Sequence, residues 1–98
     1  MIDYLCKYNI TEDDLKKIKS TFNKDIINRF ALMRSNVEEV LEYLNQNGIN
    51  NYMQLILNRP DICFMGTDVL AEKLEKFNPE LIKFIFENEV DNLINFDL

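Results

Sequence analysis

The 98-residue chain contains no histidine and no tryptophan, and only two glycines, two prolines and two cysteines. Without histidine, the commonest general base and a common metal ligand are both missing. So few glycines and prolines disfavour a β-sandwich or barrel, which needs many tight turns. The composition, 47% hydrophobic and 29% charged, is that of an ordinary folded chain, and its length fits one domain over residues 1–98. We therefore expect a single all-α domain.

The two cysteines, Cys6 and Cys63, lie far apart in the sequence. A single disulfide between them stays open, but two isolated cysteines favour buried free thiols in a reducing compartment. Residues 1–10 carry Asp3 and Lys7 and lack the apolar segment of a signal peptide. No stretch approaches the roughly 18 apolar residues of a membrane-spanning helix. These features predict a cytoplasmic protein that has no membrane partner.

Start and stop signals along the chain predict seven or eight short helices. The residues expected to cap the starts of helices are Thr11, Asn23, Ser35 (in a Ser35–Glu38 capping box), Asn50 or Asn51, Thr67 and Asn78. Gly48 is expected to close the helix that begins at Ser35 in the left-handed conformation, and Pro60 to stop the next helix. The clearest amphipathic stripe consists of Val37, Val40, Leu41 and Leu44. No segment has the alternating pattern of a strand.

An apolar pattern recurs three times along the chain. An aromatic–aliphatic pair precedes a β-branched residue by five positions in Tyr4-Leu5 with Ile10, Tyr43-Leu44 with Ile49, and Phe84-Ile85 with Val90. A second match, with a shift of 33 residues, relates Val37, Leu41 and Leu44 to Leu70, Leu74 and Phe77. The two periods disagree, so the chain contains either degenerate helical repeats of unequal length or a chance recurrence of apolar spacing. We favour short helices stacked in pairs as degenerate, solenoid-like repeats.

The middle of the chain has a distinctive order of signals. A capped helix ends at Gly48-Ile49, a short helix leads to Arg59-Pro60, an apolar turn follows at residues 62–64, and Thr67 precedes the next helix. This order, over roughly residues 35–77, resembles the helical repeat of the mitochondrial transcription termination factor (mTERF) family. The resemblance implies a right-handed stack of helix pairs that curves into a solenoid. It also implies binding of double-stranded nucleic acid through basic residues on the concave face.

Charge is distributed unevenly around a net charge of −6 and an isoelectric point near 4.5. Residues 1–35 hold seven cations and five acids, whereas residues 36–98 hold four cations and twelve acids. The basic third predicts a candidate nucleic-acid surface consisting of Lys16, Lys17, Lys19, Lys24, Arg29 and Arg34. The alternative for these residues is a solvated helical surface, which the negative net charge favours.

The C-terminal region is both acidic and aromatic. Because Phe84 and Phe86 flank Ile85, one narrow helix stripe cannot bury all three. Either this helix is central or one of its faces meets another chain. The candidate partner surface consists of Phe84, Phe86, Glu87, Glu89, Asp91 and Phe96, together with Leu93. Its carboxylates can also imitate a nucleic-acid backbone, and the alternatives are complete burial of the aromatics and a merely solubilising acidic surface.

Catalytic patterns are weak. Glu38 and Glu42 lie one turn apart on a helix, but no histidine joins them as a metal ligand or activates a cysteine. Gly48 and Gly66 stand alone, so there is no glycine-rich phosphate loop. We therefore predict no enzyme, no metal and no cofactor. The leading hypothesis is a small acidic helical module that binds another protein and regulates or inhibits a nucleic-acid-handling partner; the alternative is direct nucleic-acid binding by mTERF-like repeats through the basic third, and self-association stays open.

Overall fold

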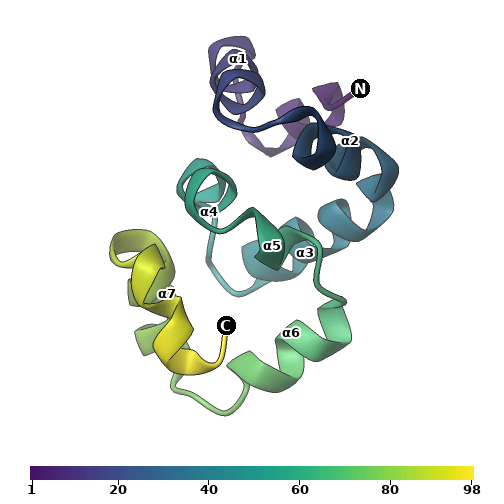
Figure 1. Cartoon of the computed structure of the whole chain (residues 1–98). Coiled ribbons are helices and arrows are strands. Elements are labelled where there is room, and N and C mark those ends of the chain that lie inside the picture. The colour runs from purple at the N-terminus through teal and green to yellow at the C-terminus, as the bar shows by residue number, and fades with distance from the viewer.

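The computed structural model describes all 98 residues and contains only helices and turns (Figure 1). The elements in chain order are η1 (Asp3–Tyr8), α1 (Glu12–Thr21), α2 (Lys24–Leu32), α3 (Arg34–Gln46), α4 (Tyr52–Asn58), α5 (Pro60–Cys63), α6 (Thr67–Leu74), α7 (Pro79–Asn88) and η2 (Val90–Phe96). The all-α prediction is confirmed. One element more than the predicted maximum is present, because the apolar turn expected after Pro60 is the four-residue helix α5.

Three predicted helix starts are confirmed in detail. The Thr11 hydroxyl accepts a hydrogen bond from the Asp14 N–H (3.1 Å), and the Asp14 carboxylate accepts one from the Thr11 N–H (3.0 Å). Asn23 caps α2 through the Ile26 N–H (3.1 Å). Asn78 caps α7 through the Glu80 N–H (2.8 Å), with Pro79 in the first turn. Each bond pairs an N–H that would otherwise lack a partner at a helix start.

Two predicted caps are wrong. The helix expected to start after Ser35 begins at Arg34, because Met33 alone separates α2 from α3 and its carbonyl already accepts from the Val37 N–H (2.9 Å). Ser35 therefore lies inside the first turn and makes no capping bond. Thr67 is likewise the first residue of α6, and the capping position belongs to Gly66, whose carbonyl accepts from the Leu70 N–H (3.0 Å).

The predicted stop signals act as expected. Gly48 has a φ of +77°, and the Ile49 N–H donates back to the Leu44 carbonyl (2.9 Å), which closes α3. Helix α4 ends at Asn58, two residues before Pro60. Pro60 is also the first residue of α5. Proline is tolerated there because the N–H that it lacks would have no hydrogen-bond partner within the helix. No helix in the structure combines the length and the apolar character needed to cross a membrane.

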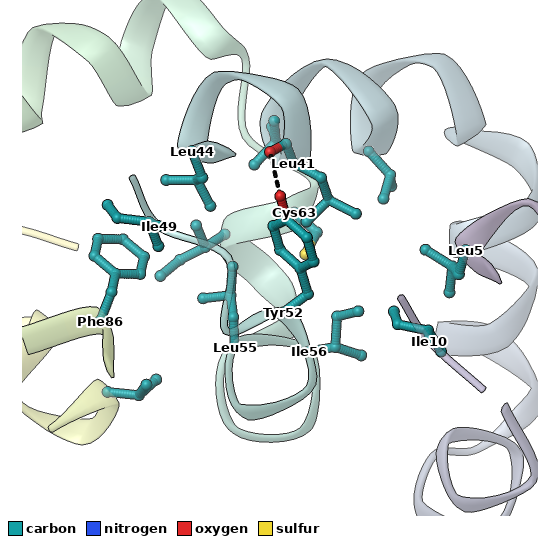
Figure 2. Packing of buried hydrophobic residues seen from close by; sticks show 14 of the residues in the cluster. Leu5, Ile10, Leu41, Leu44, Ile49, Tyr52, Leu55, Ile56, Cys63 and Phe86 are labelled. Carbon is teal, nitrogen blue, oxygen red and sulfur yellow. Dashed lines mark hydrogen bonds between the residues drawn. The ribbon is translucent and has the colours of Figure 1, made fainter. Parts of the chain in front are cut away.

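The 25 buried residues form a single cluster. Figure 2 shows Leu5 and Ile10 on one side of it, Leu55 and Ile56 of α4 in the middle, and Phe86 on the other side. The predicted stripe on α3 is buried in full, and the Tyr52 hydroxyl donates to the Leu41 carbonyl on that helix (3.3 Å, dashed in Figure 2). The molecule measures 35 × 24 × 22 Å, with α1 and α2 toward one end and α7 toward the other (Figure 1).

The recurring apolar pattern lies at matching depths. Its aliphatic and β-branched positions are all buried, namely Leu5, Leu44 and Ile85, and Ile10, Ile49 and Val90. The residue before the β-branched position is left-handed in the first two copies of the pattern, at Asn9 (φ +61°) and Gly48, but not at Glu89 (φ −142°). The backbone correspondence thus covers two copies, and the pairing of helices into repeats stays a prediction.

The different environments of Ser35 and Asn36 lead to a test of the helix start. The Asn36 amide donates to the Cys63 carbonyl (3.1 Å) and to the Met65 carbonyl (2.7 Å), which ties α3 to the end of α5. Asn36→Ala is expected to lower the free energy of unfolding by about 1–3 kcal/mol, because both half-buried carbonyls lose a donor. Ser35→Ala is expected to change it by less than about 0.5 kcal/mol. Urea unfolding measures both values. A loss for Ser35→Ala larger than about 0.5 kcal/mol would support the capping box predicted at Ser35.

A second test concerns the left-handed turn that closes α3. A Cβ at Gly48 would contact only the Lys83 side chain, at an ordinary 3.7 Å, so the cost of Gly48→Ala lies in the backbone. We expect a loss of about 1–2 kcal/mol in the free energy of unfolding. Gly48→Asn should lose less, because asparagine tolerates this conformation, as Asn9 does in the same structure. Thermal unfolding of both variants measures the difference, and equal losses would contradict the backbone explanation.

Candidate functional surfaces

An acidic hollow lies where α7 passes into η2. The carboxylates of Glu87, Glu89 and Asp91 line it, with polar side chains from α4, α7 and η2, and its volume is about 350 Å³. No cation lies within ion-pair distance of these three carboxylates. The structure thus brings together all three acids predicted for the partner surface.

Helix α7 carries an apolar patch on its outer side. Leu81 and Phe84 are exposed, with 52% of Phe84 accessible, whereas Ile82, Ile85 and Phe86 point into the core. A period of 3.6 residues separates these two sets, because positions 82, 85 and 86 fall on one stripe and positions 81 and 84 fall outside it. The exposed pair and the three acids together are called the α7–η2 surface below. The sequence prediction did not include Leu81, although its spacing of three residues from Phe84 indicates that both lie on the same side of a helix.

Three residues predicted for the partner surface are buried or half-buried. Phe86 is 1% exposed and Leu93 is fully buried, so both belong to the core. Phe96 is half-buried, and its ring packs edge-to-face on Phe77 at a centroid distance of 5.0 Å. The 3₁₀ geometry of η2 repeats every three residues, which turns residues 90, 93 and 96 inward and leaves Ile94 exposed. The sequence could not distinguish this period from that of an α-helix.

One ion pair and one hydrogen bond hold the residues that follow η2 against the rest of the fold. Arg59 makes two hydrogen bonds to the Asp61 carboxylate (3.1 and 2.9 Å) and a third to the Leu98 carbonyl. Lys73 pairs with Asp97 (2.8 Å). These donors hold the pKa of Asp61 and that of Asp97 below their usual ranges. Two of the three cations in the mTERF-like region are thus engaged in ion pairs within the chain.

The six predicted basic residues are all exposed, but they are not equivalent. Arg34 pairs with Glu38 (3.2 Å), and its guanidinium lies 5.2 Å from the centre of the Tyr4 ring. The Arg29 guanidinium lies 5.6 Å from the centre of the Phe64 ring. The four residues without an ion pair or an aromatic contact are Lys16, Lys17, Lys19 and Lys24. These four lysines make neither kind of contact within the chain, and Arg29 has no carboxylate partner, so these five residues stay open to an anionic partner.

The outer side of α2 has a feature that the sequence interpretation missed. Leu32, the last residue of this helix, is 87% exposed. It lines a shallow hollow of about 580 Å³ with Asp25, Asn28, Arg29 and Met33. Leu32 lies only two positions after the buried Phe30, so it falls outside the buried stripe of the helix. This spacing could have predicted from the sequence that Leu32 is exposed. This region is called the α2 surface below and includes Lys24 on the same helix.

The two cysteines and the paired glutamates lie in different environments. Both thiols are free, and Cys63 is buried, which raises its pKa to about 12. Cys6 is exposed, contrary to the expected burial, because η1 turns it outward; desolvation and two nearby carboxylates raise its pKa. Glu38 and Glu42 both accept from the Tyr8 hydroxyl (3.4 and 3.1 Å), which joins η1 to α3. No three histidine, cysteine, aspartate or glutamate side chains cluster closely enough to hold a metal ion.

No family model matches the chain, and no curated protein or solved structure is significantly similar to it. The mTERF resemblance is therefore one of residue order over residues 35–77.

The ion pairs of Glu38 predict a pH dependence of stability. Hydrogen bonds from Lys7 and then Arg34 lower the pKa of the Glu38 carboxyl in the folded protein. A lowered pKa stabilises the fold above the unfolded value of about 4.3, and this contribution disappears as the pH falls through the folded value. Glu38→Gln should therefore be less stable than the wild type at about pH 7, with the difference shrinking below about pH 4.

Urea unfolding at both pH values measures this difference. The control is Glu39→Gln, because Glu39 is the next residue, is exposed and forms no ion pair. A pH-independent difference for Glu38→Gln would exclude the ion pairs as its cause.

Proposed function

We propose that this protein is a non-enzymatic binding module that contacts another protein through the α7–η2 surface. The observation that carries the proposal is the half-exposed Phe84 on α7, the helix that leads into an open hollow lined by the carboxylates of Glu87, Glu89 and Asp91. The partner expected from this chemistry is a protein with a basic surface, including one that handles nucleic acid. We place this interaction in the cytoplasm, a choice supported by the two free thiols.

The two parts of the α7–η2 surface have different physical roles. Covering the exposed part of Phe84 contributes about 1.5 kcal/mol through the hydrophobic effect, and an aromatic residue is a common centre of an interface. The carboxylates of Glu87, Glu89 and Asp91 attract a basic partner and orient it, which raises the rate of association more than the affinity. The hydrogen bond from Arg59 to the Leu98 carbonyl and the Lys73–Asp97 ion pair keep the end of η2 in place, so the surface needs little ordering when it binds.

A second candidate function is direct nucleic-acid binding through α1. It is supported by the lysines of α1, Lys16, Lys17 and Lys19, which are exposed and have no carboxylate partner. The net charge of −6 opposes it, because a duplex would be repelled by the rest of the molecule. Imitation of a nucleic-acid backbone by the acidic C-terminal region belongs to the first proposal.

The first proposal predicts which variants lose a protein partner. A partner captured by the wild type is purified and titrated directly against matched variants. Phe84→Ser should weaken binding about tenfold or more, whereas Val69→Ser, which removes an exposed apolar side chain from α6, should leave it unchanged. Combined neutralisation by Glu87→Gln, Glu89→Gln and Asp91→Asn should slow association and reduce its salt dependence. Equal retention of the partner by wild type and Phe84→Ser would argue against this surface.

Nucleic-acid titrations separate the two candidate functions. Labelled duplex and single-stranded DNA and RNA are titrated at about 50 mM and then at about 200 mM salt. The protein-binding proposal expects no association at either concentration. The alternative expects micromolar binding that falls steeply with salt and is lost when Lys16, Lys17 and Lys19 are replaced together by alanine.

A further inference from the structure

The aromatic positions of the recurring pattern, Tyr4, Tyr43 and Phe84, differ in their exposure to solvent. Tyr4 is 7% exposed: its hydroxyl donates to the Phe30 carbonyl (2.7 Å), and the Arg34 guanidinium lies over its ring. Tyr43 is half-buried and lines a small hollow that includes Leu74 and Pro79. Residues from later helices thus contact Tyr4, and others share a hollow with Tyr43.

Phe84 holds the third of these positions and lies in a different environment. About half of its side chain is accessible to solvent. Of the three aromatic positions, Phe84 is therefore the most exposed, and its ring is available to a partner.

The α2 surface at the other end of the molecule has the complementary properties. Leu32 offers an apolar contact in an open hollow, and the cations Lys24 and Arg29 on the same helix have no carboxylate partner. Asp25 is the one acid among the residues that line this hollow. Figure 1 shows α2 and α7 at opposite ends of the molecule.

We propose that the α7–η2 surface of one copy of this chain docks on the α2 surface of a second copy, with Phe84 against Leu32. This inference rests on the proposed function, since it assigns an occupant to the same acidic surface. Charge complementarity favours it, because Glu87 and Asp91 have no cation partner and meet Lys24 and Arg29 of the other copy. The contact is head-to-tail, so a dimer keeps one free surface of each kind, and further copies extend it into a ring or a filament.

A charge-swap series tests the contact. One variant carries Glu87→Lys and Asp91→Lys, a second carries Lys24→Glu and Arg29→Glu, and a third combines all four changes. Sedimentation over a concentration series is expected to show association of the wild type, its loss in each of the first two variants, and its return in the third. The third variant keeps the net charge of −6, so a change in overall repulsion cannot explain its behaviour.

The wild-type protein supplies two further readouts that need no charge swap. Association should weaken as salt rises from about 0.1 M to about 1 M, because the screening length shortens from about 10 Å to about 3 Å. Phe84→Ser should weaken it about tenfold or more, whereas the control Val69→Ser should not. Far-UV circular dichroism confirms that each variant is folded.

Several outcomes would overturn the proposal. One is a wild type that remains monomeric up to about 1 mM. Another is a folded four-change variant that stays monomeric, because a tail-to-tail dimer through two α7–η2 surfaces would not be restored by both swaps. A third is undiminished association in Phe84→Ser. The proposed function survives any of these results if a basic protein still binds the wild type and does not bind Phe84→Ser. If the wild type binds no basic protein either, both the self-association and the proposed function are refuted.

Discussion

The structure depends on the burial of α4 at its centre. This helix has seven residues, too few to be stable in isolation, so its helical conformation comes from packing. It packs against α1, α5 and η2, and Leu55 and Ile56 are almost inaccessible to solvent. Gly48 sets the turn that precedes it, and Pro60 follows it as the start of the next helix. Because α4 joins the N-terminal and C-terminal parts of the core, it also fixes the separation between the basic and acidic ends of the molecule.

The two candidate surfaces are consequences of this arrangement. Helix α7 buries one stripe toward the core and so presents Leu81 and Phe84 outward. The 3₁₀ period of η2 turns three apolar residues inward, and Arg59 and Lys73 fasten its end. Glu87, Glu89 and Asp91 therefore line one hollow on a well-supported part of the fold. A supported surface of this kind suits recognition, since little conformational entropy is lost when a partner binds.

Local signals predicted the helices better than they predicted the surfaces. Thr11, Asn23 and Asn78 cap helices as expected, because their bonds involve only the next few residues. The capping box at Ser35 was wrong because α2 leaves no free chain before α3, a fact about two helices together. Phe86 and Phe84 carry the same kind of side chain two positions apart, and only the direction of the core decides which one is buried. The exposed Leu32 was missed for the same reason.

The sequence by itself determined the all-α class, most of the helix boundaries, the left-handed turn at Gly48 and the uneven charge of the two ends. These properties depend on side chains and backbone within one or two turns of each other, or on composition alone. Only the tertiary structure decided that Lys73 is paired, because its partner Asp97 lies 24 residues later, whereas the Arg34–Glu38 and Arg59–Asp61 pairs are local in sequence. It also decided that three acids share one hollow and that Phe84 stays exposed, since both depend on the direction in which α7 faces the core.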